Sequence, residues 1–206
     1  MATKDRVGLM VGILIAILLI GFGYLVFFDE PETAVLDNYQ YSNGQTIFNV
    51  TKINDEETVT LVYIGQEATP YYLNMRNDPL SLEDIEVDGT INTRLYNDDL
   101  VYVTINPNAN LSSKVTIAAF EITKILSSED FYNKPIVYGR TLENENGLPI
   151  ISCYDGTDSA TVIFFTLGSE TKVYTDEYCI IVVGETEDDI IRASDRLVYN
   201  LLGIMP

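Results

Sequence analysis

The amino-acid sequence predicts an α+β protein, with an N-terminal transmembrane helix followed by an extracytoplasmic domain that holds a mostly antiparallel sheet and two helices. A long uncharged apolar segment opens the chain. Most of the remainder consists of short runs rich in β-branched and aromatic residues, and two longer segments carry apolar residues at helical spacing. The expected organisation is a cytoplasmic tail at 1–6, an anchor at 7–28, a stalk at 29–37 and a domain at 38–206, with a candidate subdomain boundary near 143–148.

The anchor is the uncharged run from Val7 to Phe28. At about 1.5 Å per residue, a helix of this length reaches roughly 33 Å, which is enough to cross a hydrocarbon core of about 30 Å. A cleaved signal peptide is the alternative, with Gly21-Phe22-Gly23 as its cleavage site. Cleavage there would leave an apolar terminus exposed, so the sequence favours a retained anchor.

The charges beside the anchor indicate its direction. Lys4 and Arg6 precede it, whereas Asp29, Glu30 and Glu32 follow it. Lys and Arg next to a membrane span stay on the cytoplasmic side. We therefore expect a single-pass protein of the cell membrane, with its N-terminus in the cytoplasm and its C-terminal domain outside.

The composition excludes several classes of function. The net charge is -19, from 12 basic and 31 acidic side chains in 206 residues, and such a field repels nucleic acid. The chain contains no His, which removes the commonest general base and the commonest transition-metal ligand. Zincins, His-dependent triads and Cys–His proteases are excluded, and no catalytic residue, cofactor or metal ligand is expected.

The first half of the domain is expected to form strands. Residues 39–50 predict a hairpin that turns at Asn43-Gly44, because Asn-Gly between alternating residues is the strongest short hairpin signal. Further strands are expected at 58–65, 70–75 and 100–105, where β-branched and aromatic residues are dense.

The first helix of the domain is expected to begin at a cap formed by Ser112 or Ser113 and to end near Leu126. A short strand at 135–138 follows it. The polar segment 143–147 is the best candidate for a subdomain boundary.

The last part of the chain alternates strands with polar turns and ends in a helix. Four strands are expected, at 149–154, 160–167, 171–174 and 178–183. The segment 185–202 predicts the clearest helix, with Thr186 as its N-cap and Asp189 completing a variant of the capping box. Gly203 supplies the stop.

The two cysteines, Cys153 and Cys179, lie in expected strands of this last part. Outside the cytoplasm, two cysteines most often form one disulfide, which would contribute about 3–4 kcal/mol by restricting the unfolded chain. Two buried free thiols are the alternative. A thiol catalyst is disfavoured, because no His is present to activate it.

One motif resembles a catalytic pair. Ser169 and Lys172 have the Ser-x-x-Lys spacing of some Ser–Lys hydrolases. In those enzymes the motif opens a helix, whereas here it falls in an expected turn between strands. The favoured interpretation is therefore a polar turn.

Other polar patterns are less specific. Acidic clusters at 54–57, 83–88, 97–99 and 155–158 offer oxygen ligands for Ca²⁺, yet Asp, Asn and Gly are also the usual turn residues, and solvated turns are favoured. Two glycosylation sequons are present, and an extracytoplasmic location would make both available for modification; they begin at Asn49 and Asn110.

Three stretches together resemble a known group. They are Tyr72-Leu-Asn-Met-Arg-Asn-Asp-Pro79, Val101-Tyr-Val-Thr-Ile-Asn-Pro107 and Cys179-Ile-Ile-Val-Val-Gly184. Through them the chain resembles short, N-terminally membrane-anchored archaeal surface proteins that have no assigned function. The resemblance covers most of residues 58–204, implies an archaeal cell surface and supplies no catalytic residues.

The leading functional hypothesis is a non-enzymatic surface protein that binds a partner or forms part of a cell-envelope assembly. Its expected partners are the membrane, through residues 7–28, and either another envelope protein or a second copy. The alternative is a pilin-like filament subunit that packs through its N-terminal helix, although Val7 between Arg6 and Gly8 breaks the processing pattern of such subunits. An envelope hydrolase ranks last.

Overall fold

A computed structural model describes residues 37–65, 69–109, 111–143 and 147–206, which belong to one compact unit. Within these ranges no helix is long and apolar enough to cross a membrane. The expected anchor at 7–28 lies outside the described residues.

The first sheet of the domain is antiparallel throughout, as predicted. Its four strands follow one another in the order β1-β2-β3-β4. They are β1 (Asp37–Ser42), β2 (Ile47–Asn54), β3 (Glu57–Val62) and β4 (Tyr71–Met75). The predicted hairpin at Asn43-Gly44 is confirmed, because Gly44 adopts the left-handed conformation, with φ +86°, between β1 and β2.

The second sheet is mixed, and here the expectation of a mostly antiparallel arrangement is wrong. Its six strands have the order β5-β9-β10-β8-β6-β7. Of the neighbouring pairs, only β9–β10 is antiparallel. They are β5 (Glu86–Val87), β6 (Leu100–Ile105), β7 (Ile136–Arg140), β8 (Ala160–Leu167), β9 (Lys172–Asp176) and β10 (Cys179–Gly184). The run Ala160–Leu167 carries the signature of a parallel strand, since its residues are buried on both faces over most of its length.

Three helices occur among the described residues, where the sequence predicted two. They are α2 (Ile91–Asn97), α3 (Lys114–Leu126) and α4 (Glu187–Leu201). The capping box of α4 is confirmed, because the Thr186 hydroxyl accepts from the Asp189 amide and the Asp189 carboxylate accepts from the Thr186 amide. Gly203 follows α4 with φ +68°, the conformation expected of a helix stop.

The predicted strand at 149–154 is wrong. Only Ile150 makes an isolated bridge, to Arg140 at the end of β7, and Cys153–Asp155 forms a short 3-10 helix. This segment crosses the face of the mixed sheet that α3 and α4 leave uncovered. There Ile151 packs with Val162 and Cys179 in a small second core.

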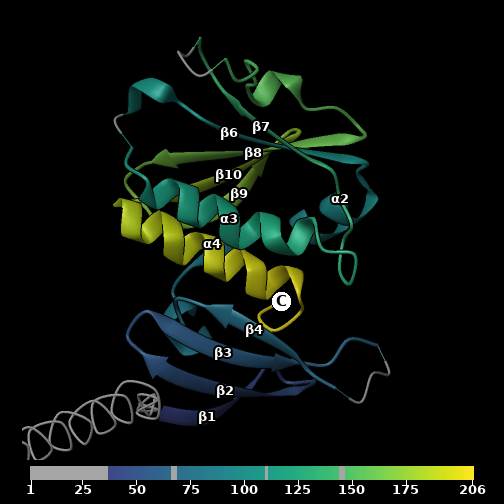
Figure 1. Ribbon diagram of the computed structural model, residues 1–206, viewed down its shortest axis with the longest axis vertical. Helices are drawn as coiled ribbons and strands as arrows, with labels where there is room; N and C mark the ends of the chain where they lie inside the picture. Colours follow the sequence, from purple (N-terminus) through teal and green to yellow (C-terminus); the bar gives the residue numbers. More distant parts are fainter. Residues whose placement is uncertain (1–36, 66–68, 110, 144–146) are drawn as a thin grey trace, which may run out of the picture. The chain divides into compact units, whose positions relative to one another are not determined.

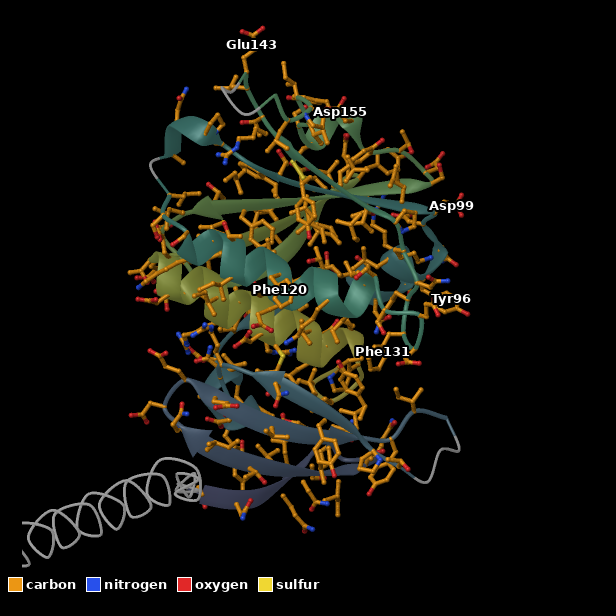
Figure 2. The ribbon with its side chains drawn as sticks, viewed as in Figure 1. Tyr96, Asp99, Phe120, Phe131, Glu143 and Asp155 are labelled. Carbon is orange, nitrogen blue, oxygen red and sulfur yellow. A yellow bond between two sulfur atoms is a disulfide. The ribbon has the colours of Figure 1, made fainter. Side chains whose placement is uncertain are left out.

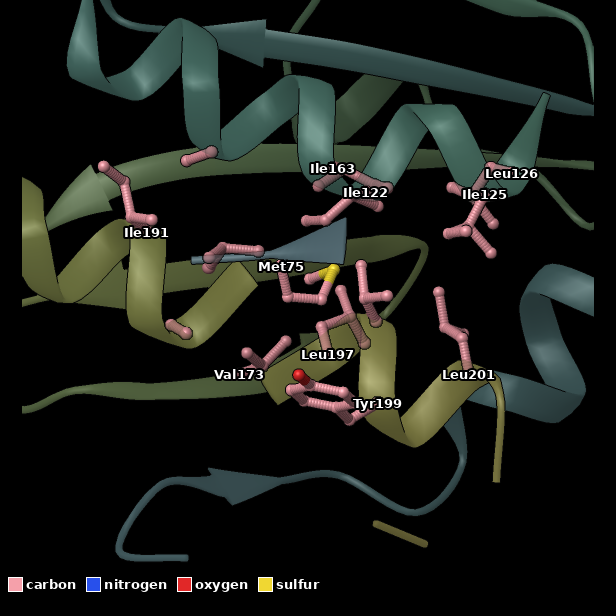
Figure 3. Packing of buried hydrophobic residues seen from close by; sticks show 14 of the residues in the cluster. Met75, Ile122, Ile125, Leu126, Ile163, Val173, Ile191, Leu197, Tyr199 and Leu201 are labelled. Atoms are coloured by element: carbon pink, nitrogen blue, oxygen red, sulfur yellow. The ribbon is translucent and has the colours of Figure 1, made fainter. Parts of the chain in front are cut away.

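The helices α3 and α4 lie between the two sheets, so the domain has three layers (Figure 1). One continuous core joins them, and Figure 3 shows Met75 of β4 in the same cluster as Ile122 of α3 and Leu197 of α4. Helix α4 lies deepest, with ten buried residues facing both sheets. Helix α3 keeps part of its surface open, and an apolar groove lies against it.

Candidate functional site

The sequence-predicted pair Ser169 and Lys172 does not form a Ser–Lys arrangement. Ser169 is exposed in the turn before β9. The Lys172 ammonium instead donates to the Glu170 carboxylate at 2.6 Å, and this hydrogen bond raises the pKa of Lys172. A Ser–Lys nucleophile needs a neutral amine, which burial away from carboxylates would provide. The motif therefore lacks the geometry and the electrostatics of that chemistry.

The acidic clusters supply caps and turns. The Asn54 side chain accepts from the Glu56 amide at 2.8 Å, and the Asp155 carboxylate accepts from the Ser152 amide at 2.7 Å. Within the described part of the chain, no three His, Cys, Asp or Glu side chains are grouped so that they could hold a metal ion.

The predicted disulfide is confirmed: Cys153 of the short 3-10 helix is bonded to Cys179 of β10. It fastens the crossing segment to the outer face of the mixed sheet. Of the two sequons, Asn49 is exposed on β2, and Asn110 lies outside the described residues.

Among the described residues, Asp195 of α4 is the most strongly buried carboxyl group, with 0% of its surface exposed. Burial raises its pKa to about 7, although the Asn77 backbone and side-chain N–H groups donate to one of its oxygens at 2.9 and 2.8 Å. Its other oxygen has no hydrogen-bond partner among the described residues. A side chain with no exposed surface cannot meet a substrate in this conformation, so we assign Asp195 to the interior that joins α4 to the antiparallel sheet.

An apolar groove of about 240 Å³ lies between α3 and the strands β6 and β7. We call it the α3–β7 groove. Most of its lining is aliphatic or aromatic, and Arg140 is its one charged residue among those described. The side chains that line it include Val103, Ile105, Val115, Ala119, Phe120, Tyr138, Arg140 and Leu148.

Two aromatic side chains form the rim of the groove. Phe120 on α3 is 61% exposed and Tyr138 on β7 is 47% exposed; Figure 2 marks Phe120 on its helix. Leu142 and Ile150, which follow β7, are exposed as well. Several exposed apolar side chains gathered at one corner of an acidic protein are typical of an interaction site.

A hydrogen bond links β7 to α3 beside the groove. The Tyr138 hydroxyl donates to the Thr123 hydroxyl of α3 at 3.0 Å, which fixes the ring against the helix. Below the rim, Val115 and Ala119 are buried and form the floor. The described lining is mostly apolar with one cation, Arg140, and it holds no nucleophile paired with a base.

Sequence reasoning missed this groove. The side of α3 that includes Ala118 and Ile122 is buried, whereas Phe120 points outward. A large aromatic residue on the polar side of an amphipathic helix was the one local signal.

No family model matches this chain, and no curated protein or solved structure matches it. The function is therefore inferred from the chemistry of the groove and from the sequence.

Proposed function

We propose that this chain is a single-pass, membrane-anchored surface protein that acts by contact, and that the α3–β7 groove binds a partner in the cell envelope. The observation that carries the proposal is the exposed pair Phe120 and Tyr138 above a buried apolar floor. Aromatic side chains are enriched at the centres of protein interfaces, and charged residues are depleted there.

The size of the groove favours a side chain as its occupant. Small-molecule and cofactor sites usually enclose about 300–1,000 Å³. The groove is smaller, at about 240 Å³, and it fits one or two apolar side chains. Burying one such side chain would contribute about 1.5–3 kcal/mol, enough for an interface of moderate affinity when several neighbours add to it.

The proposed location is the outer side of the cell membrane. The uncharged segment at 7–28 and the basic residues before it support an anchor with the domain outside. The disulfide between Cys153 and Cys179 supports an oxidising compartment. A reporter enzyme fused after Pro206 should be active outside the cytoplasm, and activity inside would contradict this location.

The contact role can be tested in native membranes. A photoreactive phenylalanine analogue at position 120 should form a discrete cross-linked product on illumination. The matched control carries the same analogue at Tyr96 of α2, which is 70% exposed and lies outside the groove. Products from position 120 alone would support the proposal, and equal products from both positions, or none, would contradict it.

A further inference from the structure

Strand β7 is an outer edge of the mixed sheet, and the directions of its backbone groups can be assigned. The Val101 N–H donates to the Pro135 carbonyl, and the Thr141 N–H donates to the Ile105 carbonyl, each at 3.1 Å. Because backbone groups alternate in direction along a strand, Val137 and Gly139 also face β6. The N–H and C=O groups of Ile136, Tyr138 and Arg140 therefore point away from the sheet.

One position of this outer edge is already paired. The Arg140 N–H donates to the Pro149 carbonyl at 2.9 Å, and the Ile151 N–H donates to the Arg140 carbonyl at 2.8 Å. The bridge between Arg140 and Ile150 is parallel. A short extended segment of the chain, 149–151, thus pairs with the end of β7, which demonstrates that this edge accepts a strand.

Within the described ranges, the rest of the edge makes no backbone pairing on its outer side. Among the described residues, the backbone groups of Ile136 and Tyr138 have no hydrogen-bond partner. Natural edges are usually protected by charge, proline or a bulge. The stretch from Ile136 to Gly139 contains none of these.

The open edge and the groove lie on the same side of the sheet. Tyr138 and Arg140 direct their side chains toward the α3 face, where both line the groove. A strand added to β7 would direct alternate side chains to that face as well, so one of them would enter the slot between Tyr138 and Phe120. Backbone pairing with pockets for alternate side chains is the usual mode of peptide addition to a sheet.

Charge narrows the chemistry of the added strand. Arg140 forms no ion pair within the part of the chain that is described, although the molecule carries 31 acidic side chains. A carboxylate on the partner, next to the apolar side chain, would pair with the Arg140 guanidinium. A second copy of this chain fits poorly, since a two-fold pairing would bring two copies of Arg140 to one interface.

We infer that the occupant of the α3–β7 groove is an extended, acidic and apolar segment of another protein, which adds as a strand to β7. This inference rests on the proposed contact function and specifies the form of its partner. The apolar side chain fills the groove, the backbone pairs with Ile136 and Tyr138, and the carboxylate meets Arg140.

The experiment uses the full chain in detergent micelles and a displayed library of random peptides about ten residues long, enough to span an edge strand. Selected peptides should alternate apolar residues and carry at least one Asp or Glu. Tyr138→Pro removes the outward N–H, a change that an edge strand tolerates, and should weaken binding at least about tenfold. Tyr138→Val removes the same side chain and keeps the N–H, so it should weaken binding by a clearly smaller factor.

A second arm leaves the protein unchanged. Methylating the peptide amides on alternate residues should abolish binding in one of the two registers and spare the other. Equal binding to wild type and Tyr138→Pro, equal tolerance of methylation in both registers, or failure to select any peptide would each overturn strand addition. A dimer of the full chain that Tyr138→Pro dissolves would also overturn it, in favour of a second copy. If strand addition fails while position 120 still cross-links in membranes, the contact function stands without it.

Discussion

The two edge strands of the mixed sheet, β5 and β7, differ in length and in charge. Strand β5 has two residues, Glu86 and Val87, and it ends at Asp88, whose carboxylate accepts from Thr175 and Thr90. Strand β7 has five residues and no charge before Arg140. A short acidic edge discourages further pairing, whereas a longer uncharged edge invites it.

This difference indicates where the domain can interact. The β5 edge is short and acidic, whereas the β7 edge is unpaired at Ile136 and Tyr138 within the described residues and adjoins the apolar groove beside Phe120. An unprotected edge strand is prone to aggregation, and its position beside an apolar slot supports a role in binding.

The largest effect is expected from the disulfide. Replacing both Cys153 and Cys179 with Ala should lower the free energy of unfolding by about 3–4 kcal/mol, because the bond closes a loop with a sequence separation of 26. The change also frees the segment that pairs with Arg140, so the Arg140 amide should exchange faster. Urea unfolding of the full chain measures the first effect and amide exchange the second. If the amide exchange of Arg140 is unchanged, the disulfide does not hold the segment 149–151 against β7.

A smaller effect is expected at Gly139, where the crossing segment approaches β7 most closely. A Cβ atom there would lie 2.6 Å from the Ile151 Cδ1 atom and 2.8 Å from the Pro149 carbonyl oxygen. Gly139→Ala should therefore cost about 1–3 kcal/mol of folding stability.

The matched control for Gly139 lies beside the other edge. A Cβ atom on Gly89, just after β5, would meet nothing within 4 Å, so Gly89→Ala should change stability by no more than about 0.5 kcal/mol. Thermal unfolding of both variants sharpens the comparison. Equal losses of stability would mean that the packing around Gly139 is no closer than the packing around Gly89.

The smallest effect concerns pH at the β5 edge. The Thr175 hydroxyl, followed by the N–H and hydroxyl of Thr90, donates to the Asp88 carboxylate, and these hydrogen bonds lower its pKa from 3.8 to about 2. The stability that ionised Asp88 contributes is present above about pH 4 and is lost as the pH falls toward about 2. Since the group is partly exposed, the contribution should be about 1 kcal/mol or less.

Asp88→Asn tests this directly. In the variant, the free energy of unfolding should fall less between about pH 5 and about pH 2.5 than it does in the wild type. Glu86→Gln is the control, because the Glu86 carboxylate accepts no hydrogen bond within the described ranges. The same fall in stability in wild type and Asp88→Asn would show that ionised Asp88 does not stabilise the turn after β5.

Elements with strong local signals were predictable from the sequence. The hairpin at Asn43-Gly44, strands β6 and β8, and the capped helix α4 were all expected at or near their observed bounds. Helix α2 was missed because its seven residues, with Ile91 and Leu95 as the buried pair, are too few to show a period.

The other errors come from contacts between distant segments. The stretch 149–154 has the composition of a strand, but the disulfide at Cys153 and the small core around Ile151 hold it across the sheet instead. The parallel order of the mixed sheet depends on which strands become neighbours after α3 crosses over, and composition does not encode this. The groove was not predicted for the same reason, since α3 and β7 form it only when they meet.

Of the motif that suggested chemistry, Ser169 lies in an exposed turn, and Lys172 begins β9 with its ammonium bonded to the Glu170 carboxylate. The residues of the candidate site, Phe120 and Tyr138, belong to no motif. Motif spacing therefore did not locate the candidate site, because the surface most suited to binding arises from the packing of α3 against β7.

Amide hydrogen exchange along β7 in the full chain tests the open edge most directly. In the free protein, the Ile136 and Tyr138 amides should exchange fast, while the Val137, Gly139 and Arg140 amides, which face β6 or Pro149, should exchange slowly. A selected peptide should slow Tyr138 at least about tenfold and leave the short strand β5 unchanged. Protection of Tyr138 in the free protein, or no change when the peptide binds, would contradict an open edge that is completed by a partner strand.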